Sequence, residues 1–167
     1  MKWDDLDRLL SFINTVVKEK RRDSNAVLYA GFDKKVTREE EAQWLAQTLV
    51  EIEAGGVINT IAEIDGKIIA NGEVTRGRYK DTRHHGHMGL TMISGYRGHG
   101  IGRMIIETLV RESRRAGLRT LDVEFLAENE TARRAYQKGE FKQAGTIPHK
   151  VFRDGKYFDG LIMAREL

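Results

Sequence analysis

Residues 96–102 constrain this chain more than any other segment, because three glycines stand there at alternate positions. An apolar stretch, residues 88–93, precedes them, and an amphipathic run, residues 103–110, follows directly. Glycines lack a Cβ, so the backbone N–H groups around them can approach an anion closely. A helix start adds unpaired N–H donors and a partial positive charge. A strand, a glycine loop and a helix in this order predict a binding site for phosphate groups.

The spacing of the glycines separates this loop from two better-known phosphate loops. No Gly-Lys-Ser/Thr follows, as a P-loop requires, and the glycines do not fit the dinucleotide pattern G-x-G-x-x-G. A tight strand-to-helix turn without a ligand is the alternative. Two arginines flank the loop and would supply full positive charges. The residues expected to bind phosphate are Arg97, Gly98, His99, Gly100, Ile101, Gly102 and Arg103.

Charge is unevenly distributed along the chain, whose net charge is +3. Residues 76–119, around the loop, carry ten Lys and Arg against three Asp and Glu, whereas residues 1–75 carry ten against fourteen. A basic segment there would attract a polyphosphate ligand, although a solvated basic helix face is the alternative. Nucleic acid is disfavoured as a partner, because aromatic residues do not interleave the basic ones and no nucleic-acid motif is present.

Hydrophobic periodicity and turn signals predict a mixture of helices and strands. Residues 4–20 have a helical pattern, and a second helix is expected to open at Thr37 with a capping box formed with Glu40. Asp65-Gly66 between two β-rich runs predicts a hairpin. Further strands are expected at residues 27–31, 86–93, 118–126, 141–145, 151–152 and 161–164, and further helices after the glycine loop and at residues 129–138. We therefore expect an α/β (α+β) fold, a single domain over residues 1–167 with one twisted mixed sheet flanked by helices.

The composition excludes several kinds of site. The chain has no cysteine, so it has no disulfide, zinc–thiolate site or thiol nucleophile. No apolar run approaches the length that spans a membrane, and the first residues are acidic rather than those of a signal peptide. We therefore expect a cytoplasmic protein with no membrane partner.

Two segments carry a resemblance to the GCN5-related N-acetyltransferases, the GNAT family. Arg97, Gly100 and Gly102 fit that family's cofactor pattern, Arg/Gln-x-x-Gly-x-Gly/Ala, at the start of a helix. The second segment, residues 124–132, contains Asn129, with Tyr136 seven residues later. The resemblance is firm over residues 58–141 and looser outside them. It implies a fold in which the strand before the loop and the strand at residues 118–126 splay apart to form a cleft for CoA.

The resemblance also implies how acetyl-CoA would be held, without a metal. The glycine loop would bind the pyrophosphate, and backbone groups of Leu90, Thr91 and Met92 would contact the pantetheine amides. The side chains of these three residues are expected to be ordinary core residues of a strand. Asn129 resembles the family's cofactor-contacting asparagine, and it is also suited to be a plain helix N-cap.

Acetyl transfer from a thioester to an amine needs one group to take the amine's proton and another to protonate the departing thiolate. Tyr136 matches the family's acid, and a phenol with a reference pKa of about 10 stays protonated at neutral pH. It lies two helical turns after Asn129, on nearly the same helix face. A packing role in the core is the alternative for Tyr136.

Three residues are candidates for the base, and the sequence leaves the choice open. Glu124 stands five residues before Asn129, where the ribosomal-protein alanine N-acetyltransferases of the family carry a base. A structural carboxylate paired with an arginine is its alternative. Glu63, on the predicted hairpin, is the second candidate. His87 is the third, and it stands where many members carry a carboxylate. This departure from the family leaves open whether the base acts directly or through water.

Two further features depart from simple expectations. The run His84-His85-Gly86-His87 suggests a metal site, but no cysteine or carboxylate is adjacent in sequence and strand alternation separates His84 from His85, so none is expected. The family usually has glycine directly before the phenylalanine that follows the tyrosine helix. Here Glu140 stands between Gly139 and Phe141, which predicts a shifted end for that helix.

These observations predict an acetyl-CoA-dependent N-acetyltransferase that transfers the acetyl group directly to a primary amine, because no cysteine can carry an acetyl-enzyme intermediate. The acceptor would be a small-molecule amine, a polyamine, a lysine or a protein N-terminus, and the acidic bias of residues 1–75 favours a cationic one. A non-catalytic CoA-binding module and a nucleic-acid-binding α/β domain are the alternatives. The sequence is also compatible with a homodimer.

Overall fold

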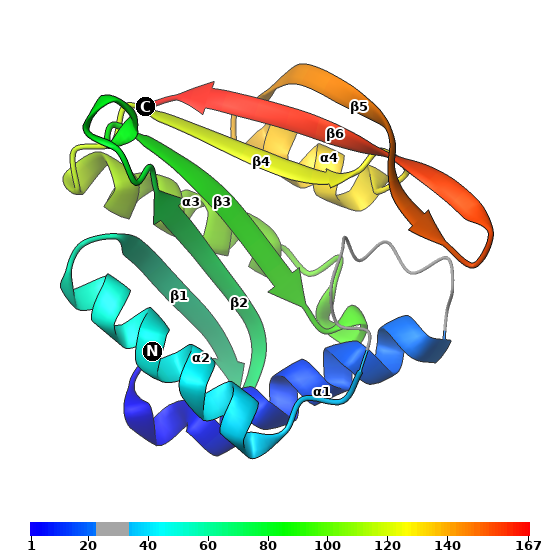
Figure 1. The fold of residues 1–167 in the computed structure, drawn as a ribbon. Coiled ribbons are helices and arrows are strands. Elements are labelled where there is room, and N and C mark those ends of the chain that lie inside the picture. Colours follow the sequence, from blue (N-terminus) through cyan, green and yellow to red (C-terminus); the bar gives the residue numbers. More distant parts are fainter. Residues whose placement is uncertain (23–33) are drawn as a thin grey trace.

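A six-stranded sheet forms the centre of the protein, in a computed structural model that describes residues 1–22 and 34–167 (Figure 1). The strands lie in the order β1-β2-β3-β4-β6-β5. Only β3 and β4 are parallel to each other, and all other neighbours are antiparallel, so the predicted mixed sheet is confirmed. The strands are β1 (Val57–Ile64), β2 (Lys67–Arg76), β3 (His85–Met92), β4 (Thr120–Leu126), β5 (Lys142–Arg153) and β6 (Lys156–Glu166).

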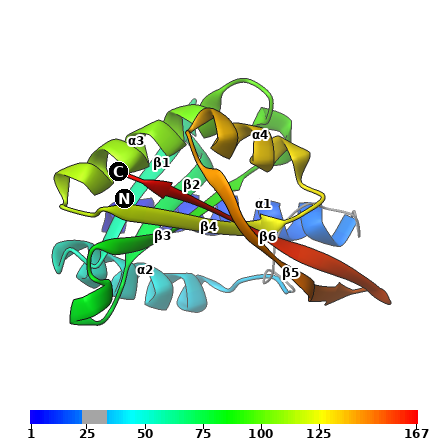
Figure 2. The same ribbon diagram turned by 90° about the horizontal axis from the view of Figure 1, so that it is seen from above.

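The four α-helices of the described residues flank the sheet, two on each face, and Figure 2 shows the arrangement from above. The pair on one face is α3 (Ile101–Arg115) and α4 (Glu130–Lys138), and the pair on the other is α1 (Leu6–Arg22) and α2 (Arg38–Glu53). Three short 3₁₀ helices, Trp3–Asp5, Lys80–Thr82 and Ser94–Tyr96, complete the elements of the described residues. None of the helices in the described ranges is long and apolar enough to cross a membrane.

Each pair of helices encloses its own hydrophobic core. The core under α3 and α4 contains residues that are fully buried, such as Met88, Leu109 and Leu121. The smaller core under α1 and α2 includes Leu9 and Leu45. Each such side chain contributes about 1.5–3 kcal/mol when it leaves water. The apolar stripe that predicted the first helix is therefore the face that α1 packs against the sheet.

Local turn and cap signals hold in the structure. Asp65 and Gly66 both adopt positive φ, 49° and 75°, as the predicted two-residue hairpin between β1 and β2 requires. Thr37 and Glu40 form the predicted capping box of α2, with the Glu40 N–H 3.2 Å from Thr37 Oγ1. These features depend on residues a few positions apart, which explains why the sequence alone revealed them.

The C-terminal hairpin differs from the prediction. Residues 141–145 and 151–152 were expected as separate strands, but they belong to one strand, β5, whose register shifts between Ile147 and Val151. Pro148 lies in that irregularity, on an edge strand, where a missing N–H costs no ladder hydrogen bond. The partner, β6, is also longer than the expected residues 161–164. The predicted strand at residues 27–31 lies outside the described residues.

The sheet opens between its two parallel strands. β3 and β4 pair only from His85 opposite Thr120 to Met88 opposite Val123. Beyond this point both strands continue, to Met92 and Leu126, without pairing with each other, and Figure 1 shows them diverging. The predicted splay of these strands is therefore present, and the glycine loop and α4 lie at its open end.

Candidate active site

The glycine loop leads directly from the diverging end of β3 into α3. Gly98 and Gly100 both have φ of 82°, a left-handed conformation that side-chain-bearing residues adopt at a cost. Gly100 is the N-cap of α3, and no side chain of the described residues caps this helix start. The first N–H groups of an α-helix have no partner within the helix. The loop thus presents the unpaired donors and the helix dipole that an anion needs.

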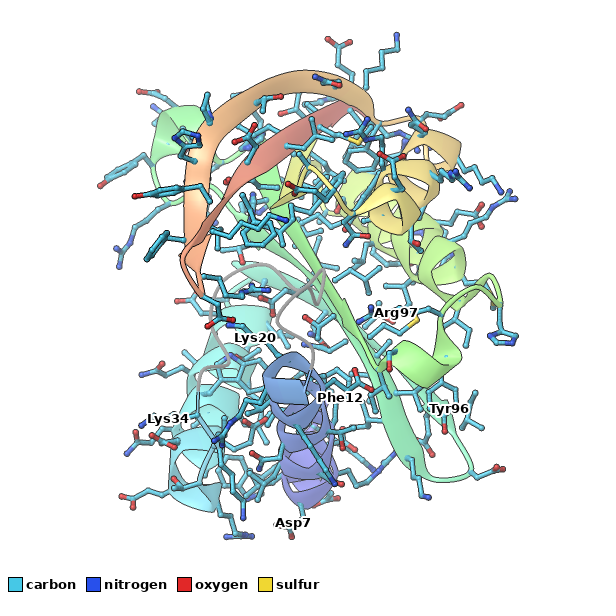
Figure 3. The ribbon with its side chains drawn as sticks, turned by 90° about the vertical axis from the view of Figure 1, so that its right-hand side faces the viewer. Asp7, Phe12, Lys20, Lys34, Tyr96 and Arg97 are labelled. Carbon is cyan, nitrogen blue, oxygen red and sulfur yellow. The ribbon has the colours of Figure 1, made fainter. Side chains whose placement is uncertain are left out.

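Contacts to neighbouring segments hold the loop in place. Arg97 Nη2 donates to the carbonyl oxygen of Met92 over 2.9 Å. The N–H and hydroxyl of Ser94 bond the carboxylate of Glu19 on α1, and the hydroxyl does so over 2.8 Å. Figure 3 shows Tyr96 and Arg97 from the side on which the strands separate. Arg97 therefore has a structural bond in addition to its expected contact with phosphate.

The other residues expected to bind the cofactor lie along the same opening. Leu90, Thr91 and Met92 pair with β2 on one side and are past the last pair with β4 on the other. Leu90 and Met92 pack on the core, as expected for their side chains. The remaining loop and helix positions are His99, which is exposed, Ile101, which packs on the core, and Arg103, whose Nε lies 2.7 Å from Glu107 Oε1.

The start of α4 lies opposite the loop. Asn129 caps α4 by accepting a hydrogen bond from the N–H of Ala132 over 3.0 Å, which is the N-cap role expected beside its contact with the cofactor. Tyr136 is 4% exposed and its ring stacks on Phe125 and meets the edge of Phe141, with centroids 5.5 and 5.4 Å away. Burial raises the pKa of the Tyr136 phenol, so the phenol stays protonated at neutral pH. Packing and proton donation are thus compatible roles for this side chain.

Two of the candidate bases, Glu63 and Glu124, lie in different parts of the sheet. Glu63 is on the edge strand β1, separated from β3 by β2, and its carboxylate pairs with Arg8 of α1. Glu124 is the first residue of β4 beyond the paired segment, and its side chain is 17% exposed. One partner of its carboxylate is a lysine, because Lys150 Nζ lies 3.6 Å from Glu124 Oε1. Glu124 thus lies at the opening, whereas Glu63 does not.

The third candidate, His87, belongs to a cluster that the sequence did not reveal. Asp122 of β4 stands opposite His87 in the parallel register. Its Oδ2 lies 3.0 Å from His87 Nδ1, and its Oδ1 lies 2.8 Å from Nε2 of His85. No carboxylate is adjacent to these histidines in sequence, but the fold supplies one. The only local signal was the placement of Asp122 and Glu124 at alternate positions of a mostly apolar strand.

Charges around this cluster shift its titration. The hydrogen bond to Asp122 raises the pKa of His87, burial opposes the rise, and the charges of Asp122, Glu124 and Glu73 add to it. Burial favours the neutral form of Asp122, but its bonds to the two histidines outweigh this and lower the pKa of Asp122. Burial raises the pKa of Glu73 on β2, another residue that the sequence analysis missed. Within the described residues, no group of three or more His, Asp or Glu is arranged to hold a metal ion.

Comparison with known proteins adds the deciding observation. The family model described as "Acetyltransferase (GNAT) family" matches residues 19–141, well over half of the chain. The chain belongs to the GNAT family. As a GNAT protein it is an N-acetyltransferase, an enzyme of the acyltransferase class.

Solved structures agree with this GNAT fold over the whole chain. A ribosomal-protein-alanine N-acetyltransferase from Brucella melitensis is 23% identical, with a TM-score of 0.82, and 100% of this chain matches 97% of that one. A GNAT-family acetyltransferase from Streptococcus pneumoniae is 22% identical, with a TM-score of 0.84 and coverage of 100% and 96%. A phosphinothricin acetyltransferase from Sinorhizobium meliloti, in complex with AcCoA, is 18% identical, with a TM-score of 0.82 and coverage of 100% and 85%.

One departure from the GNAT pattern has a structural solution. Glu140, which stands where glycine is usual, takes the left-handed conformation itself, with φ of 62°. Arg165 of β6 pairs with the Glu140 carboxylate and donates to the carbonyl oxygen of Gly139. α4 ends at Lys138, as the sequence pattern of residues 129–138 predicted.

Proposed function

We propose that this GNAT protein binds acetyl-CoA at the opening between β3 and β4 and transfers the acetyl group directly to a primary amine. One observation carries the proposal: the strand ladder ends at Met88 and Val123, and the uncapped start of α3 follows on the same side. The phosphinothricin acetyltransferase of the same fold is named as a complex with AcCoA.

The loop has the space that a bound pyrophosphate needs. A Cβ added at Gly98 or Gly100 would meet no atom of the described residues within 4 Å, so the loop borders open space among them. The N–H groups of the loop, with Arg97 and Arg103, would bind the pyrophosphate. Backbone groups of Leu90, Thr91 and Met92 lie past the last pair with β4 and would bind the pantetheine amides. Asn129, at the start of α4, would contact the cofactor across the opening.

Direct transfer needs two proton movements, and side chains near the opening fit them. An ammonium has no lone pair, so the acceptor must lose a proton before it attacks the thioester carbonyl. Glu124 and His87 are the candidates that lie near the opening, whereas Glu63 lies on the edge strand. Tyr136, kept protonated by burial, would protonate the departing thiolate. No cysteine is present in the chain to form an acetyl-enzyme intermediate.

The acceptor site favours a cationic amine. Glu73, Asp122 and Glu124 gather around His87 near the point where the strands separate. Negative charge there would attract an ammonium, as in a polyamine, a lysine side chain or a protein N-terminus. By their names, GNAT proteins of this fold act on a ribosomal protein's alanine and on phosphinothricin. The polar strand face therefore selects for positive charge rather than for one particular amine.

A two-step assay tests the proposal. Native mass spectrometry of the protein purified from cells would show a retained CoA species, and a panel of primary amines with acetyl-CoA would then show release of the CoA thiol. Transfer to at least one cationic amine is the expected result. CoA binding without release for any amine would indicate a non-catalytic module. Binding to nucleic acid that falls steeply with salt, without CoA affinity, would indicate the other alternative.

A further inference from the structure

Four side chains from two adjacent strands converge just before the sheet opens. The carboxylate of Asp122 bridges two imidazoles, with Oδ1 2.8 Å from His85 Nε2 and Oδ2 3.0 Å from His87 Nδ1. The second nitrogen of His85, Nδ1, lies 2.9 Å from Oγ1 of Thr120. His87 and Asp122 form the pair next to the last one of the β3–β4 ladder.

This arrangement determines which nitrogen of each imidazole carries the proton. An ionised carboxylate only accepts hydrogen bonds, so the nitrogen that faces each oxygen of Asp122 must be the donor. His85 is then protonated at Nε2, and its Nδ1 accepts from the Thr120 hydroxyl. His87 is protonated at Nδ1. In neutral His87, the lone pair therefore lies on Nε2, the nitrogen that does not face Asp122.

We propose that Nε2 of His87 accepts the proton of the acceptor amine, directly or through one water molecule. Asp122 is the positioning residue that holds His87 in the Nδ1–H tautomer and stabilises the imidazolium, and His85 holds Asp122 in place. This inference rests on the acetyl transfer proposed above. It replaces Glu124, the first candidate from the sequence, by His87 as the base.

The surroundings of His87 suit a proton acceptor that must meet a second substrate. Its side chain is 54% exposed, so an amine can reach it. Gly89 follows on the same face of β3 and has no side chain to cover the ring. Glu73 lies opposite Gly89 in the ladder, and its Cγ would be 3.9 Å from a Cβ at Gly89. Within residues 1–22 and 34–167, this face of the strand is therefore open at the position where the strands begin to separate.

Among the residues that the structure describes, the charged groups that face His87 all favour its protonated form. They come from the two neighbouring strands: Glu73 from β2, and Asp122 and Glu124 from β4. Lys150 of β5 lies against Glu124, so part of that carboxylate's charge is already balanced. Together these carboxylates raise the pKa of His87 from its ordinary value near 6.5. A base whose pKa lies near the working pH is the most effective one.

The proton and electron balance of the transfer closes with this assignment. The first proton of the ammonium goes to His87 Nε2, and the freed lone pair forms the C–N bond with the acetyl carbon. The C–S bond breaks, and the thiolate takes the proton of Tyr136. The amine nitrogen then gives its second proton to the Tyr136 phenolate, which restores the phenol. His87 releases the first proton to water. The products are the amide and CoA thiol.

Nuclear magnetic resonance tests the tautomer without any substrate. In protein labelled with ¹⁵N-histidine, the long-range ¹H–¹⁵N spectrum distinguishes protonated from unprotonated ring nitrogens, and His85→Gln and His87→Gln assign the signals. We expect neutral His87 to be protonated at Nδ1 in the wild type and to gain Nε2–H character in Asp122→Ala. A wild-type His87 protonated at Nε2 would overturn the inference, whether or not the protein acetylates amines.

The pH dependence of turnover separates positioning from simple structural support. Asp122→Asn should lower kcat by roughly ten- to a thousandfold. It should also move the acidic limb of the rate profile to lower pH, because the group that raises the pKa of His87 is lost. His87→Gln should abolish that limb, whereas Glu124→Gln should keep it. The reverse pattern, with the limb lost only in Glu124→Gln, would identify Glu124 as the base. If the wild type transfers no acetyl group, the proposed function fails and the tautomer measurement still decides the geometry.

Discussion

Arg97 donates a hydrogen bond through Nη2 to the carbonyl oxygen of Met92, over 2.9 Å. This bond ties the loop back to the end of the strand that precedes it. A guanidinium has five N–H donors, so one bond to the backbone leaves others for phosphate. Arg97 can therefore shape the loop and supply positive charge to it, and substitutions can separate the two effects.

Two substitutions of Arg97 should weaken acetyl-CoA binding to different extents. Arg97→Leu loses both the backbone bond and the charge, and we expect its Kd to rise about 10- to 100-fold, as for one charged hydrogen bond. Arg97→Gln retains a donor for Met92 but not the charge, so its loss should be smaller and its binding less sensitive to salt. Calorimetric titration at two salt concentrations measures both. Equal losses in the two variants would mean that the charge alone matters.

The glycine loop should reject larger side chains. We expect acetyl-CoA to raise the melting temperature of the wild type, and Gly100→Val or Gly102→Val to abolish the rise by blocking the close approach of phosphate. A Cβ at Gly102 would lie 3.7 Å from Leu90 and Met92, so Gly102→Ala fits and serves as the control that keeps the rise. An undiminished shift in both valine variants would show that CoA binds elsewhere.

Tyr136→Phe tests proton donation without disturbing packing. The ring can keep its contacts with Phe125 and Phe141, at centroid distances of 5.5 and 5.4 Å, and only the hydroxyl is lost. We expect kcat to fall by roughly ten- to a thousandfold while the Kd for acetyl-CoA changes little. Steady-state kinetics and thermal melts measure the two properties. Wild-type turnover in this variant would show that Tyr136 only packs.

The pair of His87 and Asp122 should make stability depend on pH. The pKa of His87 is raised, so its contribution is present below the unfolded value of about 6.5 and is lost as pH rises through the folded value. The pKa of Asp122 is lowered, so its contribution is present above about 3.9 and is lost as pH falls. Asp122→Asn should therefore reduce the free energy of unfolding most between about pH 4 and 6.5.

Urea unfolding of the wild type and Asp122→Asn at pH 5.5 and 8.5 measures this difference. Because the His87 side chain is 54% exposed, we expect the pH-dependent part to stay below about 1 kcal/mol. An equal loss at both pH values would mean that Asp122 contributes only through hydrogen bonds to neutral imidazoles.

The left-handed residue Glu140 allows a test of backbone strain. Glu140→Ala removes the ion pair with Arg165 and leaves a Cβ at a φ of 62°. Glu140→Gly removes the same ion pair but relieves the strain, by about 1–2 kcal/mol. We therefore expect the alanine variant to be the less stable of the two in urea unfolding. Similar stabilities would mean that the loop after α4 relaxes away from this conformation.

The sequence by itself determined the features that depend on residues a few positions apart. Glycines at φ of 82° form the loop, Asp65-Gly66 forms the tight turn and Thr37 caps α2. These conformations follow from local sterics and short-range hydrogen bonds, which a linear pattern records. The order of helices and strands, and with it the α/β fold, followed from the same signals.

Only the tertiary structure decided which side chains lie together where the sheet opens. Asp122 meets His87 because β3 and β4 run parallel in one register, and α3, which lies between them in the chain, packs over the sheet. The same packing places Glu124 at the opening and leaves Glu63 beside Arg8 on the edge. Strand register depends on burial over the whole sheet, because a slip of one residue moves every side chain to the other face. No local pattern contains that information, so the candidate base could be chosen only in three dimensions.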